Sequence, residues 1–290
     1  MIPKVIHYCW FGNNPLSSEA IKCIESWKKF CPDFEIVKWD ETNFDYSSCQ
    51  YAREAYKKGK WAFVSDYARF KILYDNGGVY LDTDVELIRE ISDLLECDAF
   101  MACESGYNRH EDSFFPHKGA KGIGAEIASG LGMGCVKGFN SFGEIIRDYQ
   151  EEEFLLDDAL YNKATVVNRI TEMFRKKGFE RNVDRIQKID EVVIYPRDYL
   201  SGIDNITGLS EITANTRAIH HGAGSWVTGK DKVFIRIHKD HMGHGRAYFY
   251  LGCLKTLFPQ LLGEINKYGF RKTLYACCMR LKTGKKIGIC

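Results

Sequence analysis

The chain has 290 residues, of which 45% are hydrophobic and 27% charged, and its formal net charge at pH 7 is +1. This ordinary globular composition excludes a disordered, collagen-like or coiled-coil protein. The 11 cysteines follow no repeating framework, which favours reduced thiols in a cytoplasmic protein. The N-terminal sequence MIPKVIHYCWFG has no charged region followed by an apolar run, and no stretch approaches about 18 uninterrupted apolar residues, so we expect neither a signal peptide nor a membrane-spanning segment.

The charge is unevenly distributed along the chain. Residues 264–290 contain seven Lys or Arg and one Glu, a charge of +6, which leaves −5 for the preceding part. The body of the chain therefore carries no general basic face, and we expect no nucleic-acid partner.

The first 40 residues predict a strand, a helix and a second strand. Residues 3–10 alternate loosely and run into a turn-rich loop, Ser17 or Ser18 opens a helix that presents Ile21, Ile24 and Trp27 on one face, and the helix stops near Cys31-Pro32. Residues 34–39 form the second strand. This order of elements predicts a parallel α/β sheet.

A helix and a strand follow at the most informative part of the sequence. Residues 61–74 carry apolar side chains at helical spacing, and Asn76-Gly77-Gly78 provides a C-terminal stop. Residues 79–87 alternate apolar and polar side chains, which predicts one strand with Asp82 and Asp84 on the same face. A further strand is predicted over residues 98–103.

The middle of the chain is glycine-rich and less regular. Residues 119–138 predict a loop around a short element, and the GLGMG sequence at 130–134 is a poor nucleotide-binding fingerprint because it does not follow a first βαβ strand. Helices are predicted over residues 144–153 and 164–177, and a strand over 192–195. We expect an α/β domain over residues 1–230 with helical additions and a helical, basic tail over 231–290.

Three neighbouring segments carry the chemistry. Asp66 and Arg69 share a helix face, where a simple ion pair would also account for them. Asp82 and Asp84 repel each other unless a cation lies between them, and carboxylate oxygens suit Mg²⁺ or Mn²⁺. Two aspartates at this spacing also occur by chance, and a phosphohydrolase is a weaker alternative because Glu86 stands where an aspartyl-phosphate phosphatase has Thr or Val.

The stretch SDYARFKILYDNGGVYLDTD, residues 65–84, resembles the DXD-containing sugar transferases of glycosyltransferase family 32. That group contains bacterial capsular polysaccharide transferases and yeast α-mannosyltransferases. IPKVIHYCWFG at 2–12 is similar to its first strand, and AIHHGAGSW at 218–226 to its C-terminal active-site segment. The resemblance implies a GT-A fold, which is a single Rossmann-like nucleotide-sugar-binding domain with a mixed sheet, and a metal-dependent retaining transfer.

The resemblance also implies roles for single residues. Trp10 would stack on the nucleobase, although a core tryptophan fits the sequence equally well. Asp66 and Arg69 would bond the donor sugar or ribose, with Tyr80 packed under the site. Asp82 would contact the sugar and reach the metal through water, and Asp84 would bind the metal directly.

The C-terminal segment completes the implied site. His221 lies five residues before Trp226, where related toxins carry a metal-binding glutamate, and an imidazole is compatible with Mn²⁺. His220 is adjacent and points to the opposite side of an extended segment. Ser225 and Trp226 would donate to the β-phosphate of the leaving diphosphate. HKDHMGH at 238–244 has a spacing that weakly suggests zinc.

These observations predict a cytoplasmic, Mn²⁺- or Mg²⁺-dependent hexosyltransferase. Its donor would be a nucleoside diphosphate sugar, specifically a UDP-sugar, and its acceptor a glycan or lipid-linked oligosaccharide in capsule or exopolysaccharide synthesis. The alternative is a non-catalytic protein of the same fold that binds sugar nucleotides. The basic tail either lies on an anionic membrane surface or packs as an ordinary terminal helix.

Overall fold

The computed structural model describes the following residues: 1–105, 124–156, 160–162, 164–203, 210, 212–222, 262, 265–266, 269–274 and 287–289. They belong to two compact units. The first contains Met1–Gly106, Gly124–Glu153 and Thr165–Ala223, and the second contains Tyr107–Ile123, Phe154–Ala164 and Gly224–Cys290. The predicted boundary at residue 230 lies outside the described residues and stays a prediction.

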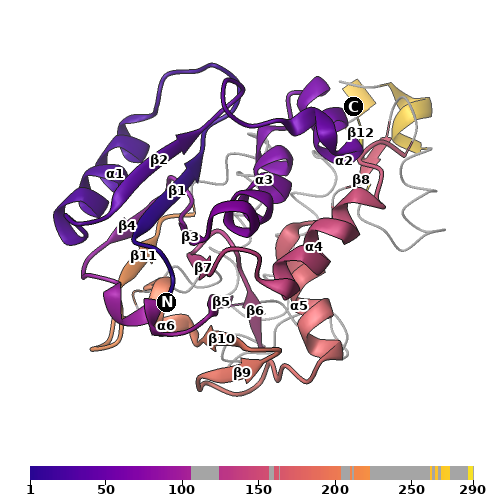
Figure 1. The fold of residues 1–290 in the computed structure, drawn as a ribbon. Helices are drawn as coiled ribbons and strands as arrows, with labels where there is room; N and C mark the ends of the chain where they lie inside the picture. The colour runs from indigo at the N-terminus through magenta and orange to yellow at the C-terminus, as the bar shows by residue number, and fades with distance from the viewer. Residues whose placement is uncertain are drawn as a thin grey trace. The chain divides into compact units, whose positions relative to one another are not determined.

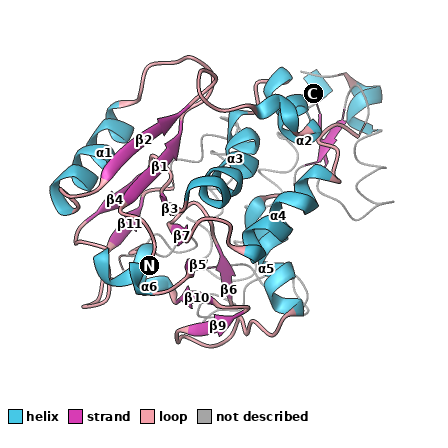
Figure 2. Cartoon of the chain, viewed as in Figure 1, coloured by secondary structure: helices cyan, strands magenta, loops and turns pink. Residues whose placement is uncertain are grey.

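A mixed sheet runs through the first unit (Figures 1 and 2). Its strands, in spatial order, are β2 (Glu35–Trp39), β1 (Val5–Cys9), β3 (Gly78–Tyr80), β7 (Met133–Cys135), β5 (Ala99–Ser105), β10 (Val192–Tyr195) and β9 (Gln187–Ile189), with β6 (Ala125–Ile127) paired to β5. Strand β1 is parallel to β2 and β3, and β10 is parallel to β5, whereas β7 is antiparallel to both β3 and β5. The predicted α/β class with a mixed sheet is confirmed.

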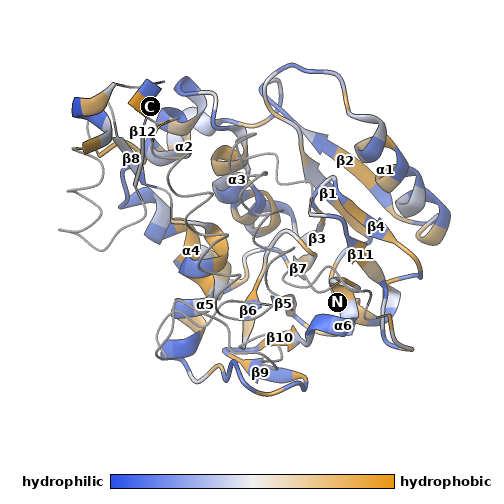
Figure 3. Cartoon of the chain, turned by 180° about the vertical axis from the view of Figure 1, so that it is seen from behind, coloured by the Kyte–Doolittle hydropathy of each residue, from blue (hydrophilic) through white to orange (hydrophobic). Residues whose placement is uncertain are grey.

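The opening βαβ unit has the predicted order. Helix α1 (Ser18–Phe30) begins after Ser17, whose hydroxyl accepts from the backbone N–H of Ala20 at 3.1 Å, and ends before Pro32. Its buried face contains Ile24 and Trp27, but Ile21, which we expected on that face, is 47% exposed. Figure 3 shows hydrophilic residues on the outer side of this helix. The prediction for Ile21 was wrong because the buried face of α1 is completed by Ala20 and Cys23.

The remaining helices of this unit are α2 (Gln50–Lys57), α3 (Trp61–Asn76), α4 (Asn140–Gln150), α5 (Val166–Lys176) and α6 (Arg197–Leu200), with short 3₁₀ turns at Tyr46–Ser48 and Ser92–Glu96. Helix α3 is confirmed, and it ends where Gly77 adopts a φ of 72°. Helices α4 and α5 overlap the predicted ranges, with α4 beginning four residues earlier than expected.

The single strand that we expected over residues 79–87 is two strands. Strand β3 ends at Tyr80, the backbone N–H of Val85 donates to the carbonyl of Asp82 at 3.1 Å, and β4 (Val85–Leu87) then pairs antiparallel with β11 (Ala218–His220) in a separate sheet. The alternating pattern continues through the turn between the strands, so periodicity alone does not reveal the break. Asp82 and Asp84 therefore lie in a turn rather than on one strand face.

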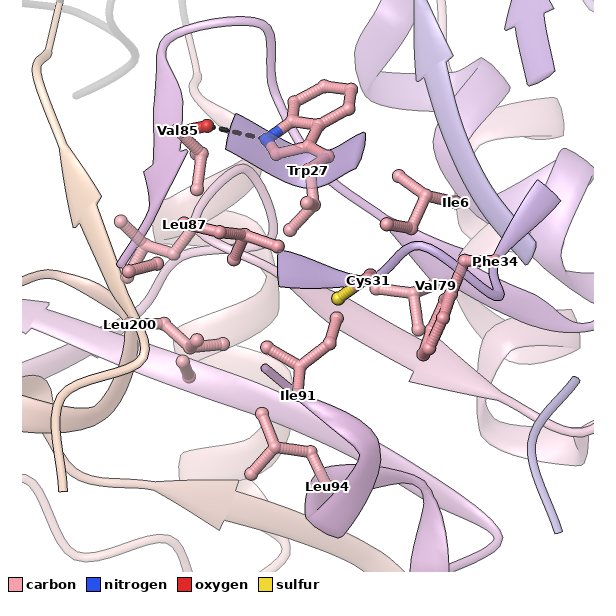
Figure 4. Close-up of a cluster of buried hydrophobic side chains, with 14 of the residues drawn as sticks. Ile6, Trp27, Cys31, Phe34, Val79, Val85, Leu87, Ile91, Leu94 and Leu200 are labelled. Carbon is pink, nitrogen blue, oxygen red and sulfur yellow. Dashed lines mark hydrogen bonds between the residues drawn. The ribbon is translucent and has the colours of Figure 1, made fainter. Parts of the chain in front are cut away.

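The hydrophobic core joins β4 to α1 and the sheet (Figure 4). Trp27 is fully buried, and its indole Nε1 donates to the carbonyl of Val85 at 2.7 Å. Ile6, Val79 and Leu87 belong to the same buried cluster. This packing holds the turn that carries Asp82 and Asp84 against the start of the chain.

In the second unit, β8 (Leu160–Asn162) pairs antiparallel with β12 (Ile287–Ile289). Phe154 stacks on Tyr161 with the ring centroids 5.0 Å apart. Residues 270–274 are helical, and Leu274 is 52% exposed. Within the described residues, none of the helices combines the length and hydropathy required to cross a membrane.

His7 connects β1 to the end of α3. Its ring is 3% exposed, Nδ1 accepts from the Trp39 indole at 3.0 Å, and Nε2 lies 3.0 Å from the carbonyl of Gly77. These partners require a neutral ring with the proton on Nε2. Burial lowers the pKa of His7 to about 4, although the bond to Gly77 opposes this change. A Cβ on Gly78 would lie 2.9 Å from Nε2, so this contact also requires glycine there.

We predict that His7 makes the fold sensitive to acid. The unfolded chain binds a proton at His7 near pH 6.5 and the folded chain only near pH 4, so stability is lost as the pH falls through this window. The loss is at most about 3 kcal/mol. Asp66, whose pKa is raised to about 6, contributes the opposite slope in both proteins, so the comparison with His7→Gln isolates the effect of His7. Urea unfolding at a series of pH values should show that the wild type loses more stability than His7→Gln as the pH falls from 6.5 to 4. Identical slopes would contradict the assignment.

Candidate functional site

Several of the predicted site residues lie at or near the carboxyl ends of the parallel strands. Strands β1, β2, β3 and β5 run in the same direction, because β7 is antiparallel to both β3 and β5. Trp10 follows β1, Asp82 follows β3, and Glu104 lies near the end of β5. In α/β sheets, ligands bind at this edge.

Arg69 is a buried side chain with partners in several segments of the site. It is 4% exposed, its Nε donates to the carbonyl of Ser65 at 3.1 Å, and its Nη1 donates to the hydroxyl of Ser129 at 3.1 Å. Its Nη2 lies 3.1 Å from Asp66 Oδ1 and 3.3 Å from Asp82 Oδ1. The guanidinium thus joins helix α3, the turn after β3 and the segment before β7.

Tyr80 and Asp66 complete the surroundings of Arg69. The Tyr80 hydroxyl donates to Asp82 Oδ1 at 3.0 Å, and the Arg69 guanidinium carbon lies 5.0 Å from the Tyr80 ring centroid. Burial raises the pKa of Asp66 to about 6, although the charge of Arg69 opposes it. At neutral pH the Asp66 carboxylate is therefore charged and paired with Arg69.

Asp84 has a different partner from Asp82. Its Oδ1 lies 3.4 Å from Nε2 of His220, which reaches it from β11. The other ring nitrogen of His220, Nδ1, is buried, lies 4.0 Å from Glu104 Oε2 and has no hydrogen-bond partner among the described residues. Burial disfavours the charged ring, but the hydrogen bond and charge of Asp84, with the charges of Glu104 and Asp82, raise the pKa of His220 to about 9.

His221 lies apart from the Asp84 carboxylate. Its backbone N–H donates to the carbonyl of Asp84 at 3.0 Å, whereas its ring Nε2 lies 2.9 Å from Glu86 Oε2. Neighbouring residues of an extended segment face opposite sides, so only one of the two histidines reaches the Asp84 carboxylate. The structure brings His220 to it, and the sequence singled out His221.

The structure describes Trp10 but not the predicted phosphate-binding residues. Trp10 is half-buried beside the hydrophobic core, and its indole donates to the carbonyl of Asn14 at 2.7 Å. Its stacking on a nucleobase stays a prediction. Ser225 and Trp226, together with the histidines of residues 238–244, lie outside the described residues.

The carboxylate and imidazole side chains of the site can supply some, but not all, of the ligands that a divalent cation needs. Among the described residues, no group of three or more His, Cys, Asp or Glu side chains is arranged to hold a metal ion. Asp84 and His220 already face each other, and a carboxylate with an imidazole is a ligand pair that Mn²⁺ accepts. Because the raised pKa of His220 keeps its ring protonated at neutral pH, the ring must release a proton when it binds the metal. Divalent cations at phosphate-transfer sites commonly take only one or two protein carboxylates and complete their coordination with substrate phosphates and water.

Sequence comparisons identify the region around this site. Residues 17–101 match the family described as "Glycosyltransferase sugar-binding region containing DXD motif". The inositol phosphoceramide mannosyltransferase 3 of Schizosaccharomyces pombe is 31% identical over 108 residues, covering 34% of this chain and 29% of that protein. An uncharacterized glycosyltransferase of Acanthamoeba polyphaga mimivirus is 34% identical over 105 residues, covering 33% of this chain and 40% of that protein. The chain thus spans less than half the length of these curated relatives.

Solved structures show weaker similarity. A glycosyltransferase involved in glycosylation of the major capsid of PBCV-1 overlaps 83% of this chain and 99% of its own, with 11% identity and a TM-score of 0.42. The galactosyltransferase LgtC overlaps 67% of this chain and 74% of its own, with 13% identity and a TM-score of 0.34. Scores this low assign no fold, so the identification depends on the sequence match alone. Residues 17–101, the range that matches the family with the DXD motif, contain Asp66, Arg69, Asp82 and Asp84.

Proposed function

We propose that the chain is a metal-dependent, retaining glycosyltransferase of GT-A type that transfers a hexose from a nucleoside diphosphate sugar, specifically a UDP-sugar. The observation that carries the proposal is a pair of ionic clusters at one edge of the sheet. Arg69 pairs with Asp66 and Asp82, and His220 pairs with Asp84. All of these residues except His220 lie in the matched range 17–101.

The two groups have separate tasks in this proposal. Asp84 and His220 would hold the divalent cation, and Asp82 would act on it through a water molecule. A bound Mn²⁺ or Mg²⁺ supplies Lewis-acid stabilisation of the departing diphosphate. Because the protein ligands are few, the cation binds most strongly together with the nucleotide. We therefore assign the imidazole ligand to His220 instead of His221.

Asp66, Arg69 and Asp82 hold the donor sugar. The carboxylates of Asp66 and Asp82 accept from sugar hydroxyls, and the buried Arg69 pairs with both carboxylates and fixes their positions. Tyr80 packs its ring against the Arg69 guanidinium and donates its hydroxyl to Asp82. Trp10 stacks on the nucleobase, and Ser225 and Trp226 donate to the β-phosphate.

The reaction requires no protein nucleophile in this proposal. The acceptor hydroxyl attacks the anomeric carbon on the face from which the diphosphate leaves, the new C–O bond forms as the sugar–phosphate bond breaks, and a diphosphate oxygen takes the hydroxyl proton. Donors fixed around the diphosphate stabilise the charge that develops on it. The carboxylates that fix the sugar keep its anomeric carbon beside the acceptor.

The biological setting is part of the proposal. The acceptor is a glycan or lipid-linked oligosaccharide of capsule or exopolysaccharide synthesis, and the enzyme works in the cytoplasm. Its basic C-terminal segment holds it at an anionic membrane surface, where each Lys or Arg contributes about 1 kcal/mol.

A donor-hydrolysis assay tests the proposal without knowledge of the acceptor. We expect the wild type to release sugar slowly from one of a panel of UDP- and GDP-sugars in Mn²⁺, and to stop in EDTA. Asp84→Asn should lower the rate at least 100-fold, because it removes a charged metal ligand. We expect the variant protein to keep its fold. An Asp84→Asn variant with wild-type rates would contradict the metal assignment. A wild type that binds these donors without hydrolysing them would indicate a non-catalytic binding protein.

The two adjacent histidines provide a matched pair of variants. We predict that His220→Ala weakens Mn²⁺-dependent UDP binding at least tenfold, because its ring faces Asp84. His221→Ala should stay within threefold of the wild type, because its ring contacts Glu86 at the half-exposed edge. Isothermal titration calorimetry with UDP, in the presence and absence of Mn²⁺, measures both variants. The reverse order of effects would restore His221 as the ligand.

A further inference from the structure

The glycine-rich segment before β7 contacts the site directly. Ser129 is fully buried, and its hydroxyl accepts from Arg69 Nη1 at 3.1 Å. The carbonyl of the next residue, Gly130, accepts from the backbone N–H of Asp82 at 3.0 Å. One dipeptide thus bonds both Arg69 and Asp82.

Gly130 also borders the Asp82 carboxylate. A Cβ built on Gly130 would overlap Asp82 Oδ2 and would lie 3.0 Å from Asp82 Cγ and 3.4 Å from Arg69 Nη1. The carboxylate therefore occupies the space that any side chain at position 130 would fill. Gly130 is not among the glycines of positive φ, so its backbone conformation does not itself require glycine. Glycine is required at position 130 because the Asp82 carboxylate fills the space of a side chain.

The segment is anchored on both sides. It lies between β6 and β7, the backbone N–H of Ala128 donates to the carbonyl of Ala102 on β5 at 2.9 Å, and the N–H of Leu131 donates to the carbonyl of Ala128 at 3.3 Å. Strand β7 then lies between β3 and β5 in the sheet. Because these bonds fix the backbone, a side chain added at position 130 must displace the carboxylate rather than the turn.

We propose that Ser129 and Gly130 are positioning residues that fix the rotamer of Asp82 and the orientation of Arg69 for donor binding. Tyr80 and Arg69 hold Oδ1 of Asp82, and Gly130 leaves room for Oδ2. With both oxygens confined, the carboxylate faces the donor in one orientation. This inference rests on the proposed role of Asp82 in donor binding, although the contacts themselves do not.

The test compares two small-to-large changes. Gly130→Ala adds a methyl group at the Asp82 carboxylate, and Gly143→Ala adds one in α4 whose three nearest heavy atoms all belong to the Tyr74 ring, the nearest at 3.0 Å. Neither change is made at a positive φ. We expect Gly130→Ala to lower kcat/KM for donor hydrolysis at least 100-fold and Gly143→Ala to lower it less than threefold, with similar Tm values for the two variants.

A third variant adds no volume. Ser129→Ala removes the acceptor of Arg69 Nη1, and we expect kcat/KM to fall about tenfold while Tm changes little. If Gly130→Ala and Ser129→Ala both hydrolyse the donor at the rate of Gly143→Ala, the positioning role is wrong.

A crystal structure of a site variant separates this inference from the proposed function. In Gly130→Ala, the Asp82 carboxylate should rotate out of ion-pair distance from Arg69. If Gly130→Ala does not fold, Ser129→Ala should show a reoriented Arg69 guanidinium. Unchanged positions would overturn the inference even if the wild type is an active transferase. Changed positions with a wild type that acts on no nucleotide sugar would contradict only the proposed function.

Discussion

The burial of one guanidinium constrains most of the site. Arg69 is 4% exposed, and a buried charge is tolerated only when it is paired and hydrogen-bonded. Its partners come from helix α3, from the turn after β3 and from the segment before β7. Those segments must meet at the carboxyl edge of the sheet for the fold to form. The same requirement gathers Asp66 and Asp82 in one place, so folding and the arrangement of the site have a common cause.

Local sequence patterns predicted much of the fold. The βαβ opening and helix α3 follow from capping residues, apolar spacing and the Gly77-Gly78 stop, all of which act within a few residues. The predicted strand over 79–87 was wrong because β4 pairs with β11, which is more than 120 residues away in the chain. The pairing is set by tertiary contacts such as the bond from Trp27 to Val85, which periodicity does not encode.

The sequence predicted some residues of the site and missed others. Helical spacing placed Asp66 and Arg69 on one helix face, and the spacing of Asp82 and Asp84 marked them together with the resemblance of residues 65–84 to a transferase family. The sequence favoured His221 over His220, because only the register of β11 against β4 decides which of the two adjacent histidines faces Asp84. Glu104 gave no signal in the sequence. Gly130 was visible only as part of a weak glycine motif, and its contact with Asp82 depends on how β7 enters the sheet.

We propose that Asp84 and His220 bind a divalent cation beside the carboxylates that pair with Arg69. A crystal structure of the protein with UDP and Mn²⁺, with the metal located by anomalous scattering, tests it most directly. The account predicts one manganese ion bonded to Asp84, to His220 Nε2 and to the diphosphate. Manganese at His221 and Glu86, or a bound UDP with no metal near Asp84, would contradict it.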